Sequence, residues 1–235
     1  MKSQSSLPMV SCVVSTADRP QFITQLIRYF LRQTWPAKEL IVVDSGKESV
    51  EQLCVAAPGV RHIRTSAETS LAERLNVGLE ISHGTLLQKL DDDDYYHPRF
   101  LERAITTLLG APNAKSIVAW DCFHVVLRGE EKLRFSGHGW AAGGTLCFPR
   151  ELWEETRFRG NAPSDYFFIN DSGATLQRIC APEMYLHVRH GGNMWRDLGG
   201  RGVDDHFRSL PPTQYRASDL VEPDDAQFYA ALASM

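Results

Sequence analysis

Short apolar runs alternate with amphipathic segments along the first hundred residues. Four apolar runs predict strands of a buried sheet: 9–15, 39–46, 60–65 and 85–90. Between them, apolar residues at helical spacing predict a helix that begins at Pro20, with Asp18 as its cap, and a second helix over 71–82. This alternation implies an α/β fold, in which a Rossmann-like, mostly parallel sheet carries helices on both faces.

The pattern changes after residue 98, where we expect a smaller mixed or antiparallel part. The predicted elements are a helix over 98–109, strands around a Gly-Glu turn in 116–135, a strand and a short helix in 143–155, and one strand in 178–190. The tail after Gly202 is rich in Asp and Pro, which suits either a mobile lid or a closing helix. The chain shows no internal repeat and no low-complexity linker. We therefore expect one domain over 1–235, in three parts: 1–98, 99–202 and 203–235.

Composition and charge narrow the class of protein. Of the 235 residues, 43% are hydrophobic and 23% charged, which allows a sizeable core, and a net charge of -4 gives no electrostatic case for a nucleic-acid partner. No run reaches the roughly 18–20 apolar residues of a membrane span, and the N-terminus lacks the layout of a secretory signal. We therefore expect no integral membrane segment, and peripheral association with a membrane is compatible with this sequence. The five cysteines are scattered without a C-x-x-C pair, so we expect neither a disulfide framework nor a zinc site, and a cytoplasmic location.

Acidic residues follow two of the predicted strands. Residues 90–98 read LDDDDYYHP, and Asp44 closes the strand predicted at 39–46. Because the carboxyl ends of parallel strands meet at the sheet edge where ligands bind, we expect Asp44 and Asp91–Asp94 to share one crevice.

The aspartate run has several interpretations. A solvated acidic loop is the simplest. An EF-hand calcium loop is excluded, since Tyr96 stands where that loop requires glycine and Pro98 follows. Gly-rich phosphate loops are absent from the first βα unit. The remaining interpretation is a site for Mg²⁺ or Mn²⁺, because these hard cations prefer oxygen ligands and commonly hold substrate phosphates.

The start of the chain resembles the opening block of family 2 glycosyltransferases, which have the GT-A fold. That block has a strand, a T-x-N/D-R turn, a helix ending in Q-T and a strand closing in V-D-D-G, and the matching residues here are VSCVVSTADRPQFITQLIRYFLRQTWPAKELIVVDSG. Later blocks are similar in family order: LAERLNVGLEISHGTLLQKLDDDDYYHPRFL with its D-x-D motif, GGTLCFPRELWEE, PSDYFF and YLHVRHGGNMW. The resemblance covers roughly residues 9–195, and it implies a nucleotide-sugar half (1–98) and an acceptor and catalytic half (99–202).

The resemblance implies a set of donor-binding residues. These are Thr16, Asp18, Arg19, Asp44, Arg74, Asp91, Asp92 and Trp195. In the family pattern Asp44 accepts a hydrogen bond from the nucleotide base, such as a uracil N3–H, and Asp91 lies near the ribose. Arg74 matches the basic residue near the diphosphate, and Trp195 covers the donor. Each has a structural alternative: a turn aspartate for Asp44, a solvent-facing helix arginine for Arg74, and ordinary packing for Trp195.

The resemblance also implies metal and catalytic residues. Asp93 matches the carboxylate that holds a Mn²⁺ or Mg²⁺ ion between the two phosphates, and His190 matches the imidazole that completes this site. His187, two residues away, competes with His190 for that role. Asp165 matches the general base that removes the acceptor proton, which implies inversion at the anomeric carbon. Its structural alternative is a helix cap.

The implied activity is an inverting, metal-dependent transfer of one sugar from a nucleoside-diphosphate sugar, with UDP-sugars favoured, to a hydroxyl of a glycan, lipid-linked or other acceptor. We expect a role in bacterial-type surface polysaccharide or glycoconjugate synthesis, and a non-processive enzyme because no Q-x-x-R-W element occurs. Ala17 and Ser45 depart from the family pattern. Two alternatives stay open: a sugar-phosphate nucleotidyltransferase, and a non-catalytic module that binds nucleotide sugar or cation. The sequence predicts no oligomeric state.

Overall fold

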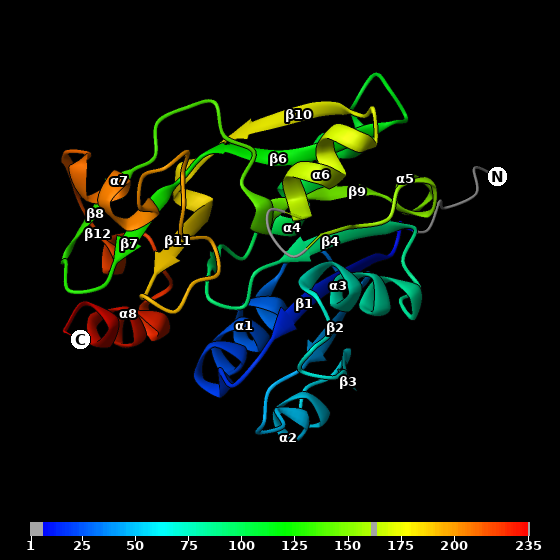
Figure 1. Ribbon diagram of the computed structural model, residues 1–235, viewed down its shortest axis with the longest axis horizontal. Helices are drawn as coiled ribbons and strands as arrows, with labels where there is room; N and C mark the ends of the chain where they lie inside the picture. The colour runs from blue at the N-terminus through cyan, green and yellow to red at the C-terminus, as the bar shows by residue number, and fades with distance from the viewer. Residues whose placement is uncertain (1–6, 161–163, 235) are drawn as a thin grey trace.

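A computed structural model describes residues 7–160 and 164–234, and Figure 1 shows their arrangement. Within these ranges the larger sheet has seven strands in the order β10-β6-β9-β4-β1-β2-β3. Their bounds are β1 Val10–Thr16, β2 Lys38–Asp44, β3 Val60–Arg64, β4 Leu86–Leu90, β6 Ser116–Cys122, β9 Cys147–Pro149 and β10 Thr175–Cys180. Among the described strands of this sheet only β9 runs antiparallel to its neighbours. The expected α/β fold with a mostly parallel sheet is confirmed.

Helices cover both faces of this sheet, because its strands alternate apolar side chains between two cores. The helices are α1 Pro20–Arg32, α2 Glu51–Val55, α3 Leu71–Glu80, α4 Phe100–Leu109, α5 Arg150–Glu155 and α6 Ser164–Asp171. Cys12 and Val14 of β1 pack with α1 and α4, whereas Val13 packs with α3, α5 and α6. Gly78 lets α3 approach closely, since a Cβ there would lie 2.6 Å from a Val13 methyl carbon.

A smaller mixed sheet lies beside the larger one, with the order β12-β8-β7-β11-β5 among the described strands. Its strands are β5 Tyr95–Tyr96, β7 His124–Leu127, β8 Lys132–Phe135, β11 Tyr185–Arg189 and β12 Pro212–Arg216. The chain passes from the larger sheet to the smaller one between β4 and β5, between β6 and β7, and between β10 and β11. The aspartate run occupies the first of these crossings.

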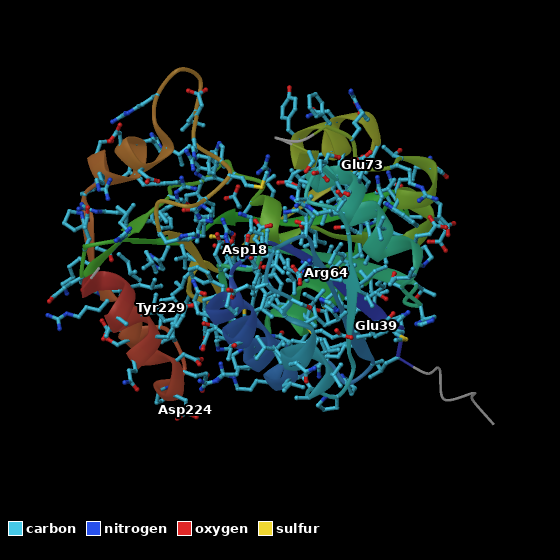
Figure 2. All side chains as sticks on the ribbon, turned by 60° about the horizontal axis from the view of Figure 1, so that its bottom comes forward. Asp18, Glu39, Arg64, Glu73, Asp224 and Tyr229 are labelled. Atoms are coloured by element: carbon cyan, nitrogen blue, oxygen red, sulfur yellow. The ribbon has the colours of Figure 1, made fainter. Side chains whose placement is uncertain are left out.

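The C-terminal region packs on the rest of the domain. It forms α7 Val203–Ser209, β12 and α8 Ala226–Ser234, and Figure 2 labels Tyr229 on α8. The hydroxyls of Tyr229 and Tyr29 of α1 are 2.7 Å apart, and the buried Asp225 pairs with Arg28 of α1. Asp225 and Tyr229 therefore tie the C-terminal helix to α1. No helix in the described ranges combines the length and the apolar character needed to cross a bilayer.

Two predicted elements differ from the structure. The single strand expected at 178–190 is two strands in different sheets, β10 and β11, because the 3-10 turn Pro182–Met184 interrupts the chain and proline cannot donate a ladder hydrogen bond. The strand expected to begin at residue 143 is a 3-10 turn over Gly143–Thr145, and only Cys147–Pro149 pairs in the sheet.

Candidate functional site

The aspartate run is buried at the crossing from β4 to β5, which excludes a solvated acidic loop. Asp92, Asp93 and Asp94 are almost fully buried, and the Asp91 side chain is 38% exposed. Burying unpaired carboxylates is strongly unfavourable, so each of them needs a partner. The structure gives each of them its own set of partners, although Arg19 donates to both Asp92 and Asp93.

Asp94 joins the aspartate run to β11. Its Oδ1 accepts a hydrogen bond from the backbone N–H of Val188 at 2.8 Å, and Tyr185 donates its hydroxyl to Oδ2. Nδ1 of His187 lies 3.2 Å from Asp94 Oδ1. Burial alone would lower the pKa of His187, but the charge and hydrogen bond of Asp94 raise it. His187 is thus a partner of Asp94, inside the protein.

Asp93 has a different set of neighbours, all on its Oδ2 atom. Nε2 of His190 lies 2.9 Å away, Asn193 donates at 3.0 Å, and Arg19 donates at 3.2 Å. Burial alone would raise the pKa of Asp93, but the His190 hydrogen bond and the Arg19 charge hold it below its ordinary value. The geometry places His190, not His187, beside Asp93. Within the described residues Oδ1 of Asp93 accepts no hydrogen bond.

Asp92 is held by the turn between β1 and α1. Thr16 donates its hydroxyl at 2.7 Å, and Arg19 donates at 2.8 Å to the other carboxylate oxygen. Burial and the adjacent charge of Asp93 raise the pKa of Asp92 to about 7, against the opposing charge of Arg19. Thr16 and Arg19 therefore bind the aspartate run itself.

Asp91 and Asp165 share a buried lysine that the motif analysis did not single out. Nζ of Lys89, only 4% exposed, lies 2.6 Å from Asp91 Oδ1 and 3.4 Å from Asp165 Oδ1. Burial alone would lower the pKa of Lys89, but the two carboxylates raise it, so the ammonium stays charged. The sequence signal was a lysine inside the apolar run TLLQKL, because lysine is rarely buried unless it is paired.

A pair of glycines lets these carboxylates converge. A Cβ on Gly143 would lie 1.9 Å from Asp165 Oδ2, and one on Gly144 would lie 2.8 Å from Asp91 Oδ2. Tyr96 donates its hydroxyl to the Gly144 carbonyl at 3.0 Å and fixes this turn. Asp165 lies in the first turn of α6, one residue after the helix begins at Ser164. Residue 163, the first of the PSDYFF segment, lies outside the described residues.

Asp44 ends β2 as expected, but its carboxylate is fully buried and engaged. It accepts hydrogen bonds from the backbone N–H groups of Gly46 (2.8 Å) and Val50 (3.1 Å) and from Arg64 (2.7 Å), and His62 lies 3.3 Å away. Burial alone would raise the pKa of Asp44, but these donors lower it. A nucleotide base would have to displace Arg64 or His62 to reach it.

Asp18 does not cap α1, which corrects the prediction. Arg19 is the N-cap residue and no side chain caps the helix. Asp18 has a φ of 54°, and its Oδ1 accepts a hydrogen bond from the backbone N–H of Lys47 at 2.6 Å. A left-handed aspartate is tolerated because its side chain bonds locally. Asp18 thus ties the turn after β1 to the loop after β2.

Arg74 and Trp195 are the two remaining residues of the implied donor site, and each has contacts within the protein. Arg74 of α3 donates to the Ser45 hydroxyl and is half-buried, so it is not a solvent-facing helix arginine. Its Nε is buried and has no hydrogen-bond partner among the described residues. Trp195 packs its ring 5.9 Å from Trp140 and donates Nε1–H to the Asp197 carbonyl at 2.9 Å.

Comparison with known proteins gives one matching family. Residues 11–172 match the family model described as glycosyl transferase family 2. The glycosyltransferase AglE of Haloferax volcanii is 29% identical over 113 residues, which cover 45% of this chain and 37% of AglE. WcaA of Escherichia coli K12, named as a candidate colanic acid biosynthesis glycosyl transferase, is 27% identical over 99 residues, 40% of this chain and 36% of WcaA. The matches thus span little more than a third of these relatives.

Solved structures share the fold. The crystal structure of S. aureus TarS 1–349 in complex with UDP-GlcNAc aligns with a TM-score of 0.62 at 15% identity, over 96% of this chain and 65% of that chain. The TarS 1–349 complex with UDP aligns with a TM-score of 0.60 at 15% identity, over 77% of this chain and 60% of that chain.

Proposed function

Because the chain belongs to glycosyl transferase family 2, we propose that it transfers one sugar from a nucleoside-diphosphate sugar to an acceptor hydroxyl. One observation carries this proposal: the buried aspartate run joins Asp93 with His190 on one side and Asp91 with Asp165 on the other. This arrangement supports a proposal in which Asp93 and His190 bind a cation and Asp165 acts as the base. Both parts of the chain contribute to this proposed site. Residues 1–98 supply Asp91–Asp93, and residues 99–202 supply Asp165 and His190.

The proposed donor is a UDP-sugar. The TarS structures that share the fold are titled as complexes with UDP and UDP-GlcNAc. In this chain the unpartnered Nε of Arg74 is a buried donor for a diphosphate oxygen, because a guanidinium binds phosphate through several N–H groups. Asp44 holds the loop after β2 through the N–H groups of Gly46 and Val50. We propose that it binds the base only when Arg64 or His62 moves away from its carboxylate.

The donor set fits a hard divalent cation, Mn²⁺ or Mg²⁺. Asp93 offers Oδ1, which no described residue engages. His190 offers Nε2, which lies 2.9 Å from Asp93 Oδ2 and would exchange that contact for the ion. Carboxylate and imidazole together suit Mn²⁺, and carboxylate oxygen suits both ions. When bound, such an ion would neutralise negative charge on the departing diphosphate.

Asp165 is the proposed general base. Its carboxylate takes the proton of the acceptor hydroxyl while that oxygen forms its bond to the anomeric carbon and the bond to the diphosphate oxygen breaks, so a single displacement inverts the centre. Lys89 positions Asp165 and Asp91 by its ion pairs. We further propose a cytoplasmic, non-processive enzyme that acts on a glycan or lipid-linked acceptor in surface polysaccharide or glycoconjugate synthesis, in keeping with the name of WcaA.

A thermal-shift panel tests the donor site. UDP, GDP, dTDP and CMP are each added with and without Mn²⁺ to the wild-type chain and to Asp93→Asn. A ligand at about a hundred times its Kd stabilises the folded state by about 2.7 kcal/mol, which is readily seen. We expect UDP with Mn²⁺ to raise the melting temperature of the wild type and not of the variant.

The other outcomes identify the alternatives. No shift with any nucleotide would contradict the donor site. Pyrophosphate release from a nucleoside triphosphate and a sugar phosphate would identify a nucleotidyltransferase. Donor binding without transfer to any of a wide panel of acceptors would identify a binding module.

A further inference from the structure

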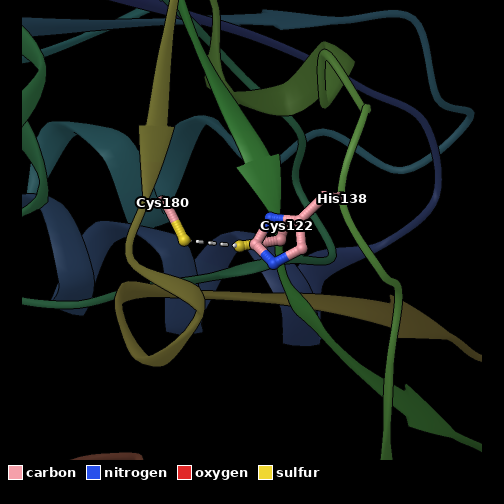
Figure 3. Close-up of side chains that lie close together, drawn as sticks. All are labelled: Cys122, His138 and Cys180. Atoms are coloured by element: carbon pink, nitrogen blue, oxygen red, sulfur yellow. Dashed lines mark hydrogen bonds between the residues drawn. The ribbon is translucent and has the colours of Figure 1, made fainter.

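A second cluster of metal-ligand side chains lies away from the aspartate run. Cys122 ends β6 and Cys180 ends β10, and these two residues face each other across neighbouring parallel strands. Their sulfur atoms are 3.4 Å apart. His138, from the loop between β8 and the Gly143–Thr145 turn, brings a ring nitrogen to the pair, and the three ligand atoms lie within 4.8 Å of one another (Figure 3).

This geometry is close to that of three zinc ligands. Zinc binds thiolate sulfur at about 2.3 Å and imidazole nitrogen at about 2.0 Å, so a tetrahedral site separates these atoms by roughly 3.5–3.8 Å. Cys122 is fully buried, whereas Cys180 and His138 are exposed, so the cluster opens to solvent on one side. Two sulfurs and one nitrogen would leave one coordination position for water.

Asp121 orients His138 in the way that carboxylates orient metal-binding imidazoles. Its Oδ2 lies 2.8 Å from Nδ1 of His138, which leaves Nε2 as the ring nitrogen without a carboxylate partner. Asp121 is itself fixed, because its Oδ1 accepts a hydrogen bond from the Gly139 N–H at 3.0 Å. A disulfide between the cysteines would need neither His138 nor Asp121.

The loop geometry allows the imidazole to reach the cysteines. The glycines on either side of His138, Gly137 and Gly139, have φ angles of 77° and 98°, which other residues rarely adopt. The cysteines, in contrast, come from paired strands, which are rigid. The cluster thus combines two fixed ligands with one adjustable ligand.

We infer that Cys122, Cys180 and His138 form a zinc site, with Asp121 as the residue that positions the imidazole. This inference departs from the expectation of no zinc site, which relied on the absence of a C-x-x-C pair, because here the two cysteines are 58 residues apart in the sequence. The bound ion fixes the loop that carries His138. That loop continues through Trp140, whose N–H donates to the Asp121 carbonyl at 3.0 Å, to the Gly143–Gly144 turn behind Asp165.

Metal titration of the full chain tests the site independently of any transferase activity. The protein is purified under reducing conditions, stripped with a chelator and titrated with Co²⁺, then with Zn²⁺. We expect one Co²⁺ to give a thiolate-to-metal charge-transfer band, which Zn²⁺ abolishes by displacing it. Co²⁺ bound to the aspartate run gives no such band, because that site holds no sulfur.

The substitutions are made at the exposed ligands, Cys180 and His138, because changes there leave the buried core intact. Cys180→Ser is expected to reduce the charge-transfer band by about half or more, because one of the two thiolates is lost, and His138→Gln and Asp121→Asn to weaken metal affinity by roughly 10–100-fold. Cys54→Ser, in α2, removes a cysteine outside the cluster and is expected to leave the band unchanged. Circular dichroism checks that each variant is folded.

Three results would overturn the inference. One is the absence of a charge-transfer band in the reduced wild type, and another is a band of unchanged intensity in Cys180→Ser. The third is a chain that binds no metal when reduced but loses two hydrogens in air, by intact mass, since this identifies a Cys122–Cys180 disulfide pair.

Discussion

Neighbouring aspartates have different roles because each has a different set of partners. Asp92 binds the turn after β1, Asp93 binds the loop after β11, and Asp94 binds β11 itself. Asp91 pairs with Lys89 of β4. A run of like charges is therefore stable in the interior, since every member has donors that offset its lost hydration.

Lys89 is expected to stabilise the fold as well as position the carboxylates. Replacing it by Met leaves Asp91 and Asp165 facing each other without a cation, which we expect to lower the free energy of unfolding by about 2–3 kcal/mol, less than for a fully buried pair because Asp91 is partly exposed. Urea denaturation measures the change. Lys115→Met is the matched control, because its pair with Glu155 is exposed and should contribute less than about 1 kcal/mol. Equal losses in the two variants would contradict the role of Lys89.

Asp165 is expected to act in the chemical step and not in donor binding. Asp165→Asn keeps the shape of the side chain but removes the base, so we expect kcat to fall by roughly 10²–10⁴-fold while the Kd for UDP stays within about twofold. Steady-state transfer assays and calorimetry with UDP measure the two quantities. Asp171→Asn, at the other end of α6 and exposed, is expected to change neither. Full activity in Asp165→Asn would remove this residue as the base.

At the scale of elements, a buried glutamate joins three segments. Glu39 of β2 accepts hydrogen bonds from the Ser11 hydroxyl of β1 at 2.7 Å and from the backbone N–H of His83, after α3, at 2.6 Å. Figure 2 labels Glu39. Burial alone would raise the pKa of Glu39, but these hydrogen bonds lower it below its ordinary value of 4.5.

The stabilisation from Glu39 is expected to depend on pH. A carboxyl whose folded pKa is lowered stabilises the protein above its ordinary pKa, and this contribution is lost as the pH falls through the folded pKa. Glu39→Gln should therefore lower stability by about 1–2 kcal/mol at pH 7 and by less at about pH 4. Urea denaturation at both pH values measures this, with the exposed Glu154→Gln as control. A difference that grows on acidification would contradict the assignment.

At the scale of the molecule, α8 closes the domain through α1. The buried Asp225 accepts a hydrogen bond from Gln25, lies 3.3 Å from Arg28 and pairs with Arg32, all on α1. Tyr229 adds its contact with Tyr29. A segment far away in the sequence thus covers the helix that carries Arg19 toward the aspartate run.

Asp225→Ala is expected to loosen this closure. Loss of the charged hydrogen bonds of Asp225 should lower the free energy of unfolding by about 2 kcal/mol, and α8 should become more sensitive to limited proteolysis. Asp224→Ala, the exposed neighbour labelled in Figure 2, is the control and should leave both unchanged. Unchanged proteolysis in Asp225→Ala would show that α8 is held by its apolar contacts alone.

The sequence by itself determined the α/β fold and the family, because the apolar periodicity of β1 to β4 and their helices is local and the family's motifs follow one another in order along the chain. It also determined which acidic residues end strands, since strand ends follow from the same periodicity. Tertiary structure alone decided which partner each carboxylate has. His190 lies on Asp93 and His187 on Asp94, Asp44 is engaged by Arg64, and Lys89 lies between Asp91 and Asp165. The approach of Cys122, Cys180 and His138 is of the same kind. Such contacts depend on how distant strands are brought into register, and no spacing along the chain encodes that directly.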